Sequence, residues 1–294
     1  MNKKNIIQYH KQINRPLVLD GAIGSLLQQH QVIIDEHLWS SYANIVEPEK
    51  VIKIHNEYVN AGADIITTNT FRTNPLAFNN SSVKISNQDF VKRSIQLAQD
   101  AVGDNKNIFI AGSNPPAEDS YQNYRTTTLD EIIKNHKTHI DMLWENGVDF
   151  ILNETQSHAD EIKIICDHCS KNNIPFVVSL FVSSNGKILS GESVNEIIKY
   201  ISNYNPIAIG INCVQPETFF NILPEINSLK RWGFYLNCGS GKYTDKEILE
   251  GVSPLDYLNI IKKNYNNSTF FIGSCCGSSP KHTTLIKEYL VGNN

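Results

Sequence analysis

The sequence predicts a single-domain α/β protein in which eight strand–helix units close into a (β/α)₈ TIM barrel. Short apolar runs recur along all 294 residues, a polar turn follows each run, and a helix-like stretch usually separates it from the next run. Barrels of this kind commonly need about 250 residues. No linker or change of composition divides the chain. We therefore expect one domain over residues 1–294.

We interpret the apolar runs as strands buried on both faces, because β-branched and aromatic residues dominate them and regular alternation is missing. The eight runs, in chain order, are 17–20, 64–70, 108–113, 150–155, 175–181, 207–213, 233–237 and 269–275. An open doubly wound sheet is the alternative fold. That fold normally carries a first turn of the type G-x-G-x-x-G, whereas residues 20–25 read DGAIGS. The closed barrel is therefore favoured.

Apolar side chains at helical spacing occupy segments between these strands. The clearest helical segments are 48–61, 130–146 and 160–171. Ser253-Pro254 and Ser279-Pro280 predict two further helix starts, because an N-cap residue is followed by proline at the first helical position. Residues 117–128 lack both patterns, so we expect a long loop after the third strand.

Composition and charge exclude several classes of partner. A formal net charge of −4 and a pI near 6.1 argue against nucleic acid or an anionic membrane as the main partner. No apolar run reaches the roughly 18 residues of a membrane span, and the N-terminus lacks the apolar core of a signal peptide. We therefore expect a cytoplasmic location, where cysteines are free, metal-bound or catalytic rather than disulfide-paired. The sequence does not predict an oligomeric state.

The residues that can do chemistry gather at the predicted carboxyl ends of the strands, which is where such barrels build their active sites. Five strands end in polar or thiol-bearing pairs, namely Asp20-Gly21, Asn153-Glu154, Asn212-Cys213, Asn237-Cys238 and Cys275-Cys276. Turns need polar residues, but they do not need four of the six cysteines in the chain. These strand ends therefore predict a functional site.

Cys213 and the adjacent Cys275 and Cys276 are candidate metal ligands, because the sixth and eighth strands lie one strand apart. Three thiolates suit Zn²⁺ and leave a fourth position for substrate; the alternative is that they are ordinary buried cysteines. Zn²⁺ with three thiolates has a net charge of about −1, which makes it a poor activator of water. A thiol bound there would still lose its proton and stay nucleophilic. Such a site favours alkyl transfer to sulfur over hydrolysis.

The sequence resembles the homocysteine S-methyltransferases along almost its whole length. The matching segments are LDGAIGS (19–25), LWS (38–40), AGADIITTNTFRTN (61–74), NET (153–155) with DE (160–161), GINC (210–213) and GSCCG (273–277). They occur in the order found in the family. The combination of GINC and CCG is highly specific, whereas LDGA or NET alone would be weak.

The resemblance implies that Cys213, Cys275 and Cys276 bind zinc, and that a zinc-bound homocysteine thiolate attacks the methyl group of an onium donor to give methionine. It further implies that Asp20 and Glu154 hold the amino group of homocysteine. Backbone near Gly21 and the side chain of Asn237 would assist. The donor implied is S-methylmethionine or S-adenosylmethionine, and the missing nucleotide fingerprint favours the smaller one.

Several departures from the family pattern leave alternatives open. The strand-seven motif, Tyr235 to Gly239, lacks the usual proline and gains Cys238. Another thiol or a selenol acceptor with an unassigned donor is therefore an alternative, as is a non-catalytic barrel that binds homocysteine and zinc. A zinc hydrolase or lyase would instead predict histidine or carboxylate ligands at the strand ends.

Three further groups of residues could act in chemistry, and for each a structural role is the stronger interpretation. Alternation along strand seven turns Cys238 away from the site if Asn237 points inward. Cys166 and Cys169 form a C-x-x-C in an apparent outer helix, where we expect them to fill space. His282 follows the CCG motif and could reach the site from the start of the last helix.

Overall fold

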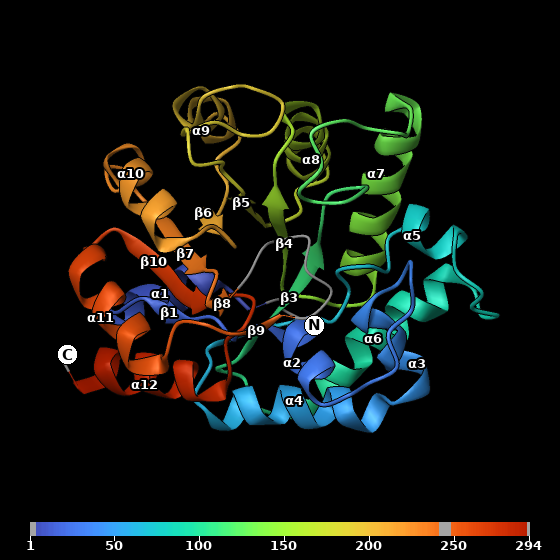
Figure 1. Cartoon of the computed structure of the whole chain (residues 1–294), viewed down its shortest axis with the longest axis horizontal. Coiled ribbons are helices and arrows are strands. Elements are labelled where there is room, and N and C mark those ends of the chain that lie inside the picture. The colour runs from blue at the N-terminus through green and yellow to red at the C-terminus, as the bar shows by residue number, and fades with distance from the viewer. Residues whose placement is uncertain (1–3, 241–247, 293–294) are drawn as a thin grey trace.

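The computed structural model describes residues 4–240 and 248–292 and contains an eight-stranded parallel sheet that curls into a nearly closed barrel (Figure 1). The strands of the barrel are β1 (Leu17–Val18), β2 (Ile65–Thr67), β3 (Phe109–Asn114), β4 (Phe150–Gln156), β5 (Phe176–Leu180), β6 (Ala208–Asn212), β7 (Trp232–Leu236) and β10 (Thr269–Ser274). They are joined in the order β1-β10-β7-β6-β5-β4-β3-β2. A parallel bridge from Leu19 to Ile65 links β1 to β2 and closes the ring. The (β/α)₈ prediction is confirmed.

Helices surround this barrel (Figure 1). Their bounds are α1 (Ile6–Ile13), α2 (Ile23–Gln29), α3 (Ala43–Val46), α4 (Pro48–Asn60), α5 (Pro75–Asn79), α6 (Asn87–Val102), α7 (Leu129–Glu145), α8 (Ala159–Lys171), α9 (Val194–Ser202), α10 (Pro216–Ile226), α11 (Pro254–Asn264) and α12 (Pro280–Gly292), with a 3₁₀ turn at Ser40–Tyr42. A short hairpin of β8 (Gly239–Ser240) and β9 (Leu249–Glu250) stands apart from the barrel sheet. Within the described ranges, no helix is both long and apolar enough to span a bilayer.

The sequence patterns located the strands and helices well but overestimated the length of several strands. Each of the eight expected runs overlaps a strand of the barrel, and the predicted helices coincide with α4, α7 and α8 to within one residue at each end. Ser253 caps α11 by accepting the backbone N–H of Asp256. The first two strands are shorter than predicted, and Asn69 instead donates from its side chain to Ser40 and Asn44. The hairpin β8–β9 was not predicted.

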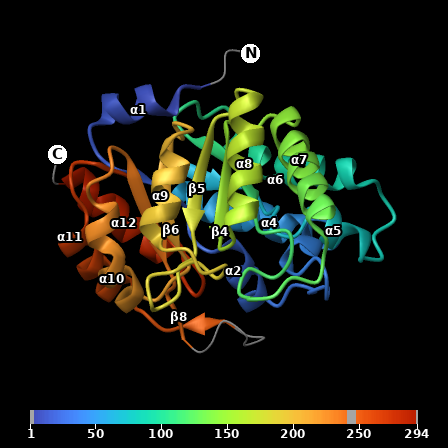
Figure 2. The same ribbon diagram turned by 90° about the horizontal axis from the view of Figure 1, so that it is seen from above.

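Apolar side chains form two layers, one inside the barrel and one between the sheet and the helices. The inner cluster contains Leu19, Ile65, Phe109, Leu152 and Phe271 among its members. Helix α1 packs against this cluster, and it lies at the end of the barrel from which the strands start (Figure 2). The carboxyl ends of the strands therefore face the opposite side, toward the hairpin β8–β9.

Asp64, the residue before β2, joins the first and last elements of the chain. Its carboxylate accepts hydrogen bonds from the guanidinium of Arg15 at 2.6 and 3.0 Å, from the backbone N–H of Val18 at 2.9 Å and from Lys287 Nζ at 2.7 Å. Although burial alone raises it, the pKa of Asp64 is lowered by the hydrogen bonds and charges of Arg15 and Lys287. A single buried carboxylate thus ties α12 to β1 at the closure of the barrel.

His55 lies on the buried face of α4, and within the described residues neither of its ring nitrogens has a hydrogen-bond partner. Burial lowers its pKa to about 4, below the unfolded value of about 6.5. The imidazole of His55 therefore binds a proton more readily in the unfolded chain than in the folded one. The free energy of unfolding is unaffected by this difference above pH 6.5 and decreases as the pH falls toward 4.

We expect His55→Leu to raise the free energy of unfolding by about 1–3 kcal/mol, because it removes two buried nitrogens without partners. The gain should be larger at pH 5.5 than at pH 7.5. Urea unfolding at both pH values checks this, with the exposed His30→Gln as control. An equal gain at the two pH values would contradict the assignment.

Candidate functional site

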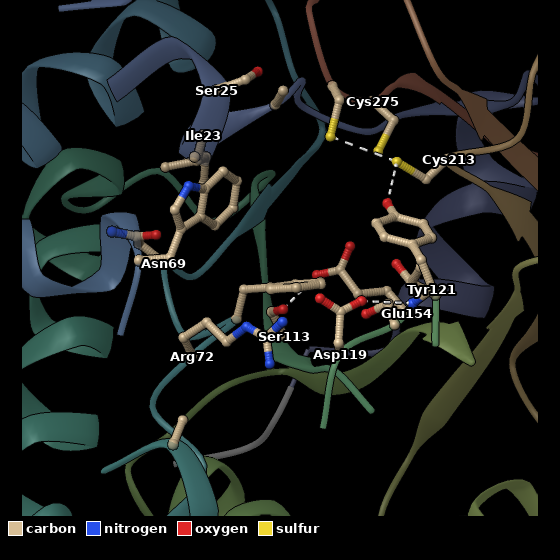
Figure 3. A pocket seen from close by; sticks show the side chains of 18 of the residues that line it. Ile23, Ser25, Asn69, Arg72, Ser113, Asp119, Tyr121, Glu154, Cys213 and Cys275 are labelled. Carbon is tan, nitrogen blue, oxygen red and sulfur yellow. Dashed lines mark hydrogen bonds between the residues drawn. The ribbon is translucent and has the colours of Figure 1, made fainter. Parts of the chain in front are cut away.

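A cavity of about 800 Å³ opens at the carboxyl ends of the strands (Figure 3). Its walls come from residues at the ends of β1, β2, β3, β4, β6, β7 and β10 or in the segments after them. Residues distant in sequence therefore meet here, as expected for a (β/α)₈ barrel. Of the site residues predicted from sequence, six line this cavity: Asp20, Gly21, Glu154, Cys213, Cys275 and Cys276.

Cys213, Cys275 and Cys276 form a cluster on one wall of the cavity. Cys213 follows β6, the other two follow β10, and β7 lies between these strands. The three sulfur atoms lie within 4.8 Å of one another, and Cys213 Sγ is 3.5 Å from Cys276 Sγ. A tetrahedral ion with Zn–S bonds of about 2.3 Å would hold its sulfurs about 3.8 Å apart. The spacing and the all-sulfur chemistry of the cluster therefore fit zinc.

Unusual backbone conformations turn these thiols toward the cavity. Cys213 has a φ of 56°, in the left-handed region that non-glycine residues rarely adopt. Gly277, after the cysteine pair, has a φ of 79°, and a Cβ there would lie 2.4 Å from the Cα of Gly239. The glycine of the CCG motif is therefore required by its conformation and by the close approach of β8.

Asn237 is absent from the residues that line the cavity. Its Oδ1 accepts the backbone N–H of Gly239 at 2.8 Å and so holds the turn on which Gly277 packs. In this structure Asn237 therefore holds the backbone of Gly239 next to the cysteine pair.

The thiols and a nearby tyrosine share hydrogen bonds. Tyr121, from the loop after β3, donates its hydroxyl to Cys213 Sγ at 3.2 Å. Hydrogen bonds from Cys275, then from Cys276, lower the pKa of Cys213 well below its usual range. The hydrogen bond to Cys213 raises the pKa of Cys275. The cluster therefore favours a sulfur anion at Cys213, which suits a cationic ligand.

Asp20 and Glu154 supply two acidic groups to the same cavity. The Asp20 carboxylate accepts the backbone N–H of Thr67 at 2.7 Å and its hydroxyl at 2.8 Å. Glu154 accepts hydrogen bonds from Ser113 Oγ and, at 3.5 Å, from Tyr235 Oη. Burial raises the pKa of Asp20 well above its usual range and that of Glu154 to about 7. In the described part of the chain neither carboxylate has a salt-bridge partner within 4.0 Å, so no protein cation there neutralises them.

Gly21 brings the backbone close to the cavity. A Cβ at this position would lie 2.6 Å from Tyr58 Oη and 2.7 Å from Ser278 Oγ. The next residue, Ala22, donates its backbone N–H to Ser278 Oγ at 3.1 Å. A side chain at residue 21 would therefore push apart the first and last βα loops.

The remaining cysteines and His282 do not reach the cavity. Cys238 is buried, its thiol points to the carbonyl of Leu236 at 3.6 Å, and burial raises its pKa. Cys166 and Cys169 belong to the apolar layer under α8, where burial raises the pKa of both thiols. His282 Nε2 lies 2.9 Å from the carbonyl of Val252. These residues have structural contacts instead.

Arg72, Tyr121 and Tyr235 line the cavity but were not identified from the sequence. Arg72 lies in the matched segment 61–74, and Tyr121 lies in the long loop expected after strand three. Tyr235 alternates with Leu236 on β7, so its inward direction could have been derived from the strand period. The positions of the two loop residues depend on contacts between βα loops.

Comparison with known proteins identifies methyltransferases that act on homocysteine or selenocysteine as similar to this chain. The family model described as homocysteine S-methyltransferase matches residues 17–290. Homocysteine S-methyltransferase 2 of Arabidopsis thaliana is 24% identical, covering 96% of this chain and 95% of that protein. Selenocysteine Se-methyltransferase of Brassica oleracea var. italica is 22% identical, covering 93% and 88%. The metallated form of the homocysteine methyltransferase MmuM from Escherichia coli shares the fold with a TM-score of 0.80 at 20% identity, covering 97% and 100%.

Proposed function

The chain belongs to the homocysteine S-methyltransferase family of methyltransferases, and from this premise we propose that it transfers a methyl group from S-methylmethionine or S-adenosylmethionine to L-homocysteine, forming methionine. The observation that carries the proposal is the placement of three convergent thiols, the buried carboxylate of Asp20 and the partly buried carboxylate of Glu154 in one cavity. A thiol and an ammonium group, the two ends of homocysteine, are the ligands that these groups would bind. Residues 1–294 would act as one homocysteine-binding barrel.

We propose zinc as the metal, held by Cys213, Cys275 and Cys276. The borderline-soft ion favours thiolate ligands, and three of them leave one position for a substrate sulfur. When bound, it would supply the positive charge that keeps the acceptor thiol ionised near neutral pH. The free thiols of this chain favour a reducing compartment, so a cytoplasmic location is part of the proposal.

Asp20 and Glu154 would hold the ammonium group of homocysteine, and the backbone at Gly21 would assist. Burial penalises both carboxylates while they are charged, and a bound cation would offset that penalty. Ser113 and Tyr235 orient Glu154 through its two carboxylate oxygens. Homocysteine would thus be held at its sulfur by the metal and at its ammonium group by the two carboxylates. These two contacts would fix the orientation of the thiolate toward the methyl donor.

Methyl transfer itself is a single displacement. The acceptor sulfur donates an electron pair to the methyl carbon of the donor, and the bond from that carbon to the sulfonium sulfur breaks. The leaving sulfur keeps the bonding electrons and becomes a neutral thioether. Trp39 and Phe71 line the cavity with ring centroids 6.3 Å apart, and their faces suit the positive charge of the donor.

Glu154→Gln is expected to raise the KM for homocysteine by about 10–100-fold, because a charge-assisted hydrogen bond to the ammonium becomes a neutral one. The zinc content and the KM for the methyl donor should stay unchanged, since the substitution leaves the thiols intact. Steady-state kinetics with each substrate varied in turn, together with metal analysis, checks both statements. A KM for homocysteine equal to that of the wild type would show that Glu154 does not bind the ammonium group of homocysteine.

The proposal is tested by incubating zinc-loaded protein with homocysteine and each candidate donor and quantifying methionine. Parallel incubations replace homocysteine with selenocysteine, because relatives named selenocysteine methyltransferases also match this chain. Protein stripped of metal by a chelator is the control. Formation of methionine only with zinc would support the proposal. Binding of homocysteine without product from any donor would instead indicate a non-catalytic barrel.

A further inference from the structure

Arg72 is the one lysine or arginine among the described residues that line the cavity. Six acidic side chains share these walls: Asp20, Glu36, Glu118, Asp119, Glu131 and Glu154. A cavity built only to receive a cation would gain nothing from a guanidinium. Its presence indicates that some ligand brings an anionic group to this part of the wall.

The surrounding loops hold Arg72 in place. Its backbone N–H donates to Ser41 Oγ at 3.2 Å, and its Nη1 donates to the carbonyl of Glu118 at 3.0 Å. The guanidinium lies 5.7 Å from the ring centroid of Phe71. These contacts come from three different βα loops, so the guanidinium is fixed before a ligand arrives.

The charge of Arg72 is not matched by the protein. Within residues 4–240 and 248–292, no acidic side chain forms an ion pair with it within 4.0 Å. Burial lowers the pKa of Arg72, and the nearby Asp119 carboxylate opposes that shift. A partly desolvated guanidinium without a paired anion is costly, and a bound carboxylate would offset this cost through two parallel hydrogen bonds.

Arg72 lies on the far side of the cavity from the thiols. Figure 3 shows it beside Asp119, across the cavity from Cys213 and Cys275. In a direct displacement, the leaving sulfonium stands opposite the attacking sulfur, with the methyl group between them. The donor therefore lies farther from the cysteines than homocysteine does, which places its remaining atoms toward Arg72.

We infer that Arg72 binds the carboxylate of the methyl donor and so selects sulfonium donors that carry one. This inference rests on the proposed function. S-methylmethionine and S-adenosylmethionine both carry an α-carboxylate, whereas trimethylsulfonium does not. Asp119, whose Oδ1 accepts the backbone N–H of Tyr121 at 2.8 Å, would face the ammonium of the same amino-acid end.

The test compares S-methyl-L-methionine with its α-carboxamide in wild-type protein, Arg72→Gln and Arg72→Lys. The wild type should prefer the carboxylate by about 10–100-fold in kcat/KM, and Arg72→Gln should abolish this preference through a higher KM for S-methylmethionine. Its rate with the carboxamide and its KM for homocysteine should be unchanged, and lysine should restore part of the preference. Arg93→Gln is the matched control, because Arg93 also donates to a backbone carbonyl, that of Asn44 at 2.9 Å, but lies outside the cavity lining.

Two results would overturn the inference. An equal loss of kcat/KM with both donors would mean that Arg72 has a structural role. A raised KM for homocysteine alone would mean that Arg72 binds the acceptor instead of the donor. Calorimetry with zinc-loaded protein separates this inference from the proposed function, since it measures donor binding without turnover. If no donor yields methionine, the proposed function is wrong. The role of Arg72 would still be supported if the wild type binds S-methylmethionine more tightly than its carboxamide and Arg72→Gln does not. Equal binding of the two donors, or no binding, would overturn it.

Discussion

Cys276→Ala is expected to remove the metal and to reduce methyl transfer by at least about 10³-fold. Only two thiols would remain of a cluster whose three sulfurs lie within 4.8 Å. Zinc sites with catalytic roles commonly use three protein ligands, and a site with two binds far more weakly. Without the ion, the acceptor thiol keeps an unperturbed pKa of about 8.5, so little of it is ionised at pH 7.

Metal analysis and turnover of the purified variant check this expectation together. Cobalt offers a second measurement, because Co²⁺ bound by thiolates absorbs visible light and reports the number of sulfur ligands. Cys238→Ser is the matched control, since Cys238 is a buried cysteine on the neighbouring loop after β7 and its thiol points to the carbonyl of Leu236. Full zinc content in Cys276→Ala, or equal losses in both variants, would contradict the assignment of the cluster.

Asp64→Ala should have the largest effect on stability, with a loss of about 3–5 kcal/mol in the free energy of unfolding. The substitution removes the acceptor of four hydrogen bonds and leaves Arg15, whose side chain is 8% exposed, without its ion-pair partner. Because the folded-state pKa of Asp64 is lowered, its stabilisation is present above the unfolded value of about 3.8 and is lost as the pH falls through the folded value. The penalty of the variant should therefore shrink in strong acid.

Chemical unfolding of the wild type and of Asp64→Ala at pH 7 measures this penalty. The exposed Asp104→Ala provides a matched control that should change stability by no more than about 0.5 kcal/mol. A loss below about 1 kcal/mol at Asp64 would mean that the carboxylate does not link the two ends of the barrel as described.

The fold and the thiols could be predicted from sequence because each depends on a local pattern. Buried strands are continuous apolar runs, and a parallel barrel assigns the same edge to every strand end, so the approach of Cys213 to Cys275 and Cys276 follows from topology. The direction of each side chain cannot be predicted from these patterns alone, because it also depends on the local backbone conformation. The φ of 56° at Cys213 is not encoded by its residue type, and it decides where the sulfur points.

The rest of the cavity depends on contacts between loops that are distant in sequence. Arg72 is held by the carbonyl of Glu118, and Tyr121 reaches Cys213 from a different part of the barrel. Neither contact has a period or a motif from which it could be derived. The hydrogen bond from the Gly239 backbone N–H to Asn237 Oδ1 likewise follows from the turn after β7 and from no motif.

The pairing of β1 with β10 has a consequence for synthesis on the ribosome. Leu17 pairs with Phe271 and Val18 with Ile272, so the ring cannot close before nearly the whole chain has been translated. Until then β1 and β7 present open edges, and unpaired edges are sites of aggregation. Lys287, which pairs with Asp64, is translated later still, so this ion pair also forms only after the chain is almost complete.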